Sequence, residues 1–185
     1  LHANRLGSKS TALGYAALHS QRPVDGSGND QATDMHNTAV GNKSGYSLTT
    51  GIENTFVGSL AGDATDDGRE NVAVGKSALS ANCGDGNTAV GKDAGETITG
   101  ANNTVLGKSA GKVLTGGNNN MFLGVDAGLA GSPGGQQTTS SDRIGLGDEN
   151  VTNCHIQVDW TVASDARDKT DFTALDLGLD FVKDL

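Results

Sequence analysis

The chain has few aromatic residues, cysteines and prolines, and no long apolar run. Aromatic residues make up 4% and hydrophobic residues 35% of its 185 residues, so one chain has little apolar material for a large core. A glycan-cleaving enzyme needs aromatic platforms and paired carboxylates in a groove, and this composition supplies little of either. The two cysteines, Cys83 and Cys154, form neither a zinc pattern nor a disulfide framework, and we expect free thiols.

Basic charge and membrane-spanning patterns are also scarce. Lys and Arg total 13 against 22 Asp and Glu, for a net charge of −9, which disfavours nucleic acid and anionic membranes as partners. No stretch of 18 apolar residues and no signal-peptide pattern occurs, so we expect no membrane insertion. The chain starts with Leu1 rather than Met and stops at Leu185 within an apolar pattern, which predicts a segment of a longer protein.

What the sequence does contain is a repeated nine-residue pattern. Its clearest copy is Asn-Thr-Ala-Val-Gly-Lys-Asp-Ala-Gly at residues 87–95, and we number positions one to nine from Asn87. The copies recur at a step of about 16 to 17 residues, which is typical of solenoids and stacked arrays. A degenerate copy follows at residues 143–147. The glycines at position five of the regular copies are Gly41, Gly58, Gly75, Gly91, Gly107 and Gly124.

Each regular copy has an aliphatic residue at position four, glycine at position five and a small residue at position eight. This favours a short strand and a tight bend over a helix, since glycine costs roughly 1 kcal/mol in a helix interior. Several copies carry a second apolar residue, such as Leu48, Ile98 or Leu114, so we expect two short strands and two turns per rung. We expect positions four and eight to point inward. So narrow a core favours three chains around one axis.

The array is interrupted twice. Residues 19–36 are polar and contain turn-forming residues, and we expect a loop that projects from the stack. Residues 131–141 have the composition of a linker or exposed loop. We assign residues 1–148 to the Gly-rich repeat stack. The predicted fold class is therefore all-β, a homotrimeric β-roll or β-helix stalk with a short C-terminal helical segment.

The pattern changes after the stack. Residues 149–163 are predicted to form a neck strand, because apolar and polar residues alternate there. The alternating apolar residues are Ile156, Val158, Trp160 and Val162. Residues 164–185 contain Leu175, Leu179 and Val182, whose spacing predicts one stripe of a short helix.

The segment Ser164-Asp165-Ala166-Arg167-Asp168-Lys169 resembles the opening S-D-x-R-x-K motif of a self-cleaving chaperone domain. That intramolecular chaperone lies at the C-terminus of many phage tail fibres, tail spikes and endosialidases. The resemblance covers residues 164–185, which would be the truncated start of the domain. It implies an autocleavage dyad of Ser164 and Lys169, supported by Asp165 and Arg167. From the spacing of these residues alone, such a segment usually means a helix N-cap at Ser164 followed by a solvated first turn.

The repeats also resemble phage fibre shafts and, more loosely, the heads of trimeric autotransporter adhesins. The resemblance implies a structural and host-adhesion component of a bacteriophage tail fibre, located in the virion and made in the host cytoplasm. Its expected partners are two identical chains, other tail or baseplate proteins, and a glycan or outer-membrane receptor on a bacterium. The alternatives are a bacterial trimeric surface adhesin and the stalk of a polysaccharide-degrading tail spike.

No cofactor, metal or activity on an external substrate is expected, and single-turnover serine autoproteolysis is the one reaction that the resemblance implies. The acidic cluster at residues 63–68 lacks the twelve-residue calcium loop with its closing Glu. The four histidines are scattered along the chain, at His2, His19, His36 and His155. They form no pair at helical metal-ligand spacing.

Overall fold

The computed structural model describes residues 7–22 and 33–153, and these residues form short strands and no helix. Eight strands build one parallel sheet in the order β10-β9-β8-β7-β6-β5-β4-β2, and β1 pairs with β3 separately. The strands are β1 Gly7–Ser8, β2 Thr11–Leu13, β3 Thr33–Asp34, β4 Thr38–Val40, β5 Thr55–Val57, β6 Val72–Val74, β7 Thr88–Val90, β8 Thr104–Leu106, β9 Met121–Leu123 and β10 Ile144–Leu146. No helix in the described part is long and apolar enough to cross a membrane.

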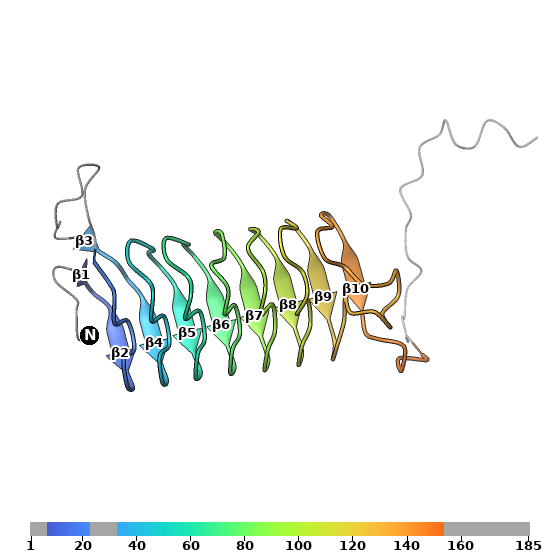
Figure 1. Cartoon of the computed structure of the whole chain (residues 1–185), viewed down its shortest axis with the longest axis horizontal. Coiled ribbons are helices and arrows are strands. Elements are labelled where there is room, and N and C mark those ends of the chain that lie inside the picture. The colour runs from blue at the N-terminus through green and yellow to red at the C-terminus, as the bar shows by residue number, and fades with distance from the viewer. Residues whose placement is uncertain (1–6, 23–32, 154–185) are drawn as a thin grey trace, which may run out of the picture. The chain divides into compact units, whose positions relative to one another are not determined.

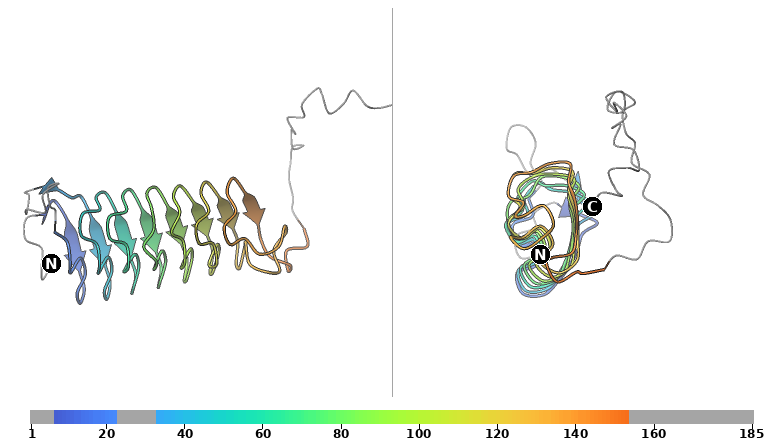
Figure 2. Two further views of the ribbon diagram at one scale, coloured as in Figure 1. Left: turned by 45° about the horizontal axis from the view of Figure 1, so that its top comes forward. Right: turned by 90° about the vertical axis from the view of Figure 1, so that its right-hand side faces the viewer.

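The described repeats form a parallel β-solenoid with one sheet strand in each turn of the coil. Equivalent positions of successive copies are Cα partners, as where Val57 pairs with Val74 and Val74 with Val90. Figure 1 shows the strands side by side along the solenoid axis, and the end-on view in Figure 2 shows the turns superposed. The predicted all-β repeat fold is confirmed.

The prediction of two strands per rung is wrong for the described copies. After the glycine at position five, the chain bends through position seven in the left-handed region, with φ of 53° at Lys43, 55° at Ser77 and 57° at Ser109. Backbone hydrogen bonds still join rungs beyond the bend, as from Gly45 N–H to Ala61 O at 2.9 Å. The remaining walls of the coil are therefore stacked turns rather than strands.

The expected orientation of position four is also wrong. Position three points inward and is buried in every copy from β4 to β9, as at Ala39, Phe56 and Ala73, whereas Val57 and Val74 at position four are only partly buried. Successive residues of a strand point to opposite faces, so positions two and four share the outer face. Position eight points inward as expected, as at Ala61 and Ala78.

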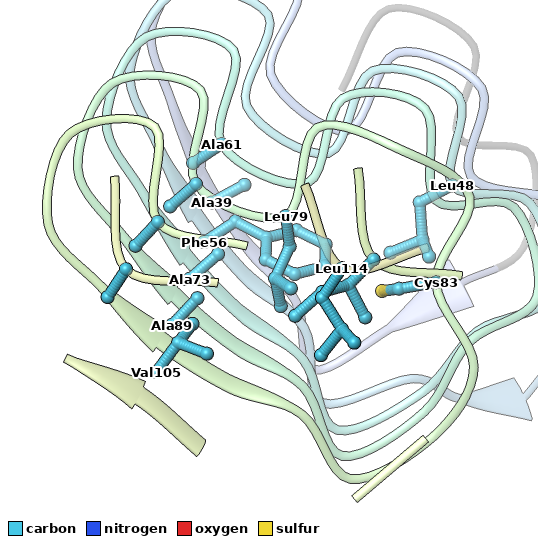
Figure 3. Packing of buried hydrophobic residues seen from close by; sticks show 14 of the residues in the cluster. Ala39, Leu48, Phe56, Ala61, Ala73, Leu79, Cys83, Ala89, Val105 and Leu114 are labelled. Atoms are coloured by element: carbon cyan, nitrogen blue, oxygen red, sulfur yellow. The ribbon is translucent and has the colours of Figure 1, made fainter. Parts of the chain in front are cut away.

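Two inner columns compensate each other in volume. Phe56 at position three is followed in its turn by Thr65, whereas Ala39 is followed by Leu48 and Ala89 by Ile98. Figure 3 shows Phe56, Ala39 and Leu48 among the packed inner side chains. All of these side chains are buried. A large apolar side chain thus fills the narrow interior of these turns, as close packing requires. The turn of β8 holds two buried apolar side chains, Val105 and Leu114.

Both interruptions of the array begin or end within the coil. Ser20 N–H donates to Tyr46 O at 3.1 Å, so the start of the predicted 19–36 loop stacks on the next rung. Within residues 131–141, Thr138 O accepts from Thr115 N–H at 2.6 Å. The degenerate copy at residues 143–147 supplies β10, which pairs with β9. Residues 23–32 and 154–185, and so most of the predicted neck and the C-terminal helix, lie outside the described residues.

Candidate interaction surface of the sheet

A ladder of buried asparagines at position one fixes the start of each strand. Asn37 Oδ1 accepts from the backbone N–H of Asn54 at 2.9 Å and from Asn54 Nδ2 at 3.1 Å, while Asn37 Nδ2 donates to Gly51 O at 2.8 Å. Asn103 and Asn120 repeat this arrangement. Each buried amide thus pairs with a backbone N–H at the start of the next strand and with a backbone carbonyl of the turn. Buried polar groups need such hydrogen-bond partners.

The glycines at position five fix the other end of each strand. Their φ angles lie between 116° and 140° from Gly14 to Gly124, a region that side chains rarely adopt. A Cβ on Gly91 would also overlap the carbonyl oxygen of Gly107 in the next rung. Together the asparagine and glycine columns hold the three-residue strands in exact register, so their outer side chains form straight columns.

The outer face of this sheet consists of positions two and four of every copy. Several of its apolar side chains are exposed, with 67% of Leu13, 50% of Leu106 and 67% of Ile144 accessible. None of its residues is charged, although 19% of the chain is charged. Its residues are Thr11, Leu13, Thr38, Val40, Thr55, Val57, Val72, Val74, Thr88, Val90, Thr104, Leu106, Met121, Leu123, Ile144 and Leu146. We call this set the outer sheet face.

Charged residues border the outer sheet face on both sides. Position six, just after the strand end, is lysine in three successive copies, at Lys76, Lys92 and Lys108, all exposed. The residues just before the strands include Glu53 and Glu70, both exposed. We call these sides the strand-end border and the strand-start border. The strand-end border is therefore basic over three successive rungs, whereas the strand-start border carries acids at Glu53 and Glu70 together with the exposed bases Arg69 and Arg143.

Two shallow hollows lined by both polar and apolar residues lie along the strand-start border. One, of about 640 Å³, is lined by residues that include Asp67, Arg69 and Asp85, and the other, of about 260 Å³, by residues that include Asp142 and Arg143. Asn102 lines both. Both hollows therefore contain acidic and basic side chains that can form hydrogen bonds. No aromatic side chain is among the residues that line them.

The described residues bring together no group of three His, Cys, Asp or Glu side chains that could hold a metal. Cys83 is a free, buried thiol, and burial raises its pKa, an effect that the contact with the Thr65 hydroxyl partly offsets. Ser164, Asp165, Arg167 and Lys169, the residues of the predicted autocleavage site, lie outside the described residues.

The outer sheet face was not predicted from the sequence, because position four was assigned to the interior. The signal was nevertheless present, since positions two and four of the copies never carry a charge while position six carries lysine repeatedly. When both faces of a strand carry apolar residues, hydrophobicity alone does not show which face points inward. No family model, curated protein or solved structure matches this chain.

Proposed function

We propose that the chain is the shaft of a homotrimeric bacteriophage tail fibre and the start of the chaperone domain that assembles it. Its work is mechanical and adhesive, since it holds or presents a surface that binds a receptor on a bacterial cell. The observation that carries the proposal is the S-D-x-R-x-K motif at residues 164–169, which follows an array of stacked repeats and the predicted neck at residues 149–163. The solenoid fold and the uncharged outer sheet face support the same function.

A stacked solenoid suits a shaft because its length grows by one strand spacing with each repeat and every rung contacts only its neighbours. Such an array has one strand of its sheet unpaired at each end, and folding that begins at different rungs can lose register. A C-terminal domain that trimerises first would bring three chains into register before the repeats stack.

The proposed chemistry is a single acyl transfer. Ser164 Oγ attacks an adjacent peptide carbonyl, Lys169 Nζ accepts the hydroxyl proton, and the leaving amine takes that proton as the C–N bond breaks. Water then hydrolyses the resulting ester. Lysine can act as this base only where burial or nearby positive charge lowers its pKa, so assembly of the trimer would switch the reaction on.

The denatured intact mass of the full-length protein tests this proposal. We expect the wild type to split at Ser164, the Ser164→Ala and Lys169→Met variants to stay whole, and an exposed-serine control, Ser141→Ala, to split like the wild type. A wild type that remains whole while it is trimeric would contradict the autocleavage. Release of sugar from a bacterial polysaccharide by the full-length protein would instead favour a tail-spike enzyme.

A further inference from the structure

We propose that identical chains associate in parallel through the outer sheet face, with the strand-end border of one chain against the strand-start border of the next. The inference rests on the proposed function only for the number of chains, three. It assigns to the assembly a face, an orientation and a set of ionic contacts that the fibre proposal leaves open.

The first argument is the composition of the outer sheet face. Eight strands at a spacing of about 4.8 Å span about 34 Å, and the face with its two borders is roughly 20 Å wide, or roughly 700 Å². That area is close to the approximately 800 Å² that each partner buries in a standard interface. The uncharged stripe itself is three residues wide, or about 10 Å, and so covers about 340 Å². With exposed Leu106, Met121 and Ile144, it is comparable to the largest apolar patch on a typical monomer, which is often functional.

The second argument is charge complementarity between the two borders. Lys76, Lys92 and Lys108 follow the ends of β6, β7 and β8, whereas Glu53 and Glu70 precede β5 and β6. The next turn adds Asp85, which precedes β7, and the exposed Arg69 lies beside Glu70, so these three acids outnumber the one base on this stretch of the border. Lysine and acid thus occupy overlapping heights along the axis. Within the described residues, Lys76, Lys108, Glu53 and Glu70 form no ion pair.

The orientation follows from symmetry. Rotation about an axis parallel to the solenoid places the strand-end border of one chain against the strand-start border of the next, so lysines face carboxylates. An antiparallel pair, related by an axis along the strands, would place lysine border against lysine border. Like charges opposed in this way disfavour that arrangement. The same rotation makes equivalent rungs meet at equal heights.

The occupant of the face is therefore a second copy of this chain. The straight columns of the face repeat with the rung spacing, and a parallel copy has the same spacing and the same sequence of heights. Threonines at position two, such as Thr55 and Thr88, can satisfy their hydroxyls on each other or on the neighbouring chain. A partner with a different repeat would lose this match after a few rungs.

The first experiment measures the mass of the full-length protein by light scattering over a range of concentrations. We expect Val74→Asp, at the centre of the face, to weaken association by at least about 100-fold, since it would bury an unpaired charge in each chain. Ala64→Asp introduces the same aspartate at an exposed site on another wall of the coil and should leave the mass unchanged. Val74→Ser, with unchanged circular dichroism, checks that a milder change also weakens association while the fold persists.

The second experiment tests the orientation by crosslinking. In a Cys154→Ser background, co-expressed Thr38→Cys and Val40→Cys chains should form a disulfide between chains on oxidation, because parallel copies place the start of β4 in one chain opposite the end of β4 in the next. Thr99→Cys, exposed away from the face, should not. Lys76→Glu and Glu70→Lys, which flank the same strand β6, should each weaken association, and the double variant should recover most of the loss.

The outcomes separate the two proposals. A trimer whose mass is unaffected by Val74→Asp would overturn this interface while the fibre proposal stands. Thr38→Cys and Val40→Cys chains that stay uncrosslinked within one trimer would overturn the parallel orientation. A wild type that is monomeric at every concentration would overturn both proposals, and a parallel dimer would retain the face but contradict the trimeric fibre.

Discussion

The interior of the solenoid contains two kinds of column that follow different rules. In the columns that contact backbone, one residue type recurs: asparagine at position one from Asn37 to Asn120, and glycine at position five from Gly14 to Gly124. In the columns that contact side chains, the residue varies from alanine to phenylalanine, as from Ala39 to Phe56. The backbone has the same geometry in every rung, so the residues that contact it must be of one type. Residues that contact side chains can vary, because a smaller side chain can be offset by a larger one in the same turn.

The glycine column should give the largest effect. We expect Gly91→Ala to lower the free energy of unfolding by at least about 3 kcal/mol, because φ is 137° there and the new Cβ would overlap Gly107 O. Gly116→Ala is the matched control, since no atom lies within 4 Å of its Cβ position and its φ is not positive. It should be neutral or stabilise by about 0.4–1 kcal/mol. Urea unfolding at one protein concentration measures both.

Equal destabilisation by the two alanines would contradict the distinction between the columns. It would mean that each glycine affects stability only through the conformational entropy of the unfolded chain, which is the same at both sites. Restoration of Gly91→Ala by a change in a neighbouring side chain would also contradict it, because a backbone oxygen cannot be made smaller.

The apolar columns should give the next effect. We expect Phe56→Ala to cost about 3–5 kcal/mol, since Thr65 supplies no compensating volume in that turn. Phe56→Leu should cost less than about 1.5 kcal/mol. Adding Thr65→Leu to Phe56→Ala should recover part of the loss, because it recreates the pairing of Ala39 with Leu48. A double variant no more stable than Phe56→Ala would show that the two columns do not exchange volume.

Much of the fold could be predicted from the sequence, because repetition is visible without any coordinates. The recurring glycines from Gly41 to Gly124 predicted a stacked β-array, and the degenerate copy at residues 143–147 forms the last strand, β10. Glycine in a fixed place excludes helices on energetic grounds alone, so the class of secondary structure followed from composition and spacing.

The orientation of the strands could not be predicted in the same way. A three-residue strand offers only one alternation, and Ala39 or Val40 could each have pointed inward by period. Hydrophobicity favoured the valine, but position three lies inside whether it is Ala39 or Phe56, and Val40 lies on the outer sheet face. The way the coil closes determines which of positions three and four points inward. Closure depends on the bends at positions five and seven, and their geometry could not be predicted from the sequence.

The candidate surface was missed for the same reason, while the predicted site at Ser164 and Lys169 stays a prediction. The asparagine ladder was also missed as a structural device. Its signal was the recurrence of asparagine at position one of six successive copies from Asn37 to Asn120, which a solvated turn would not require. Buried amides that bridge rungs do require it.

A third prediction concerns unequal rungs within that asparagine ladder. Asn103 accepts from the N–H of Asn120 and from Asn120 Nδ2, and its own Nδ2 donates to Gly117 O at 2.9 Å. Asn71 accepts the equivalent bonds from Asn87, but its buried Nδ2 has no partner in the described part. We expect Asn103→Ala to cost about 2–3 kcal/mol and Asn71→Ala about 1 kcal/mol less. Urea midpoints that coincide for the two variants would contradict the difference.

The smallest expected effect is the pH dependence of stability that the buried Cys83 thiol contributes. Burial raises the pKa of its thiol, so the folded chain keeps this proton at a pH where the unfolded chain, with a pKa of about 8.5, has begun to lose it. The unfolded state then binds fewer protons, and stability falls as pH rises above about 8.5. Under reducing conditions, the loss of stability from pH 8 to pH 10 should be smaller in Cys83→Ala than in the wild type. Parallel losses in the two proteins would show that the thiol titrates alike folded and unfolded, and that this inner column is open to water.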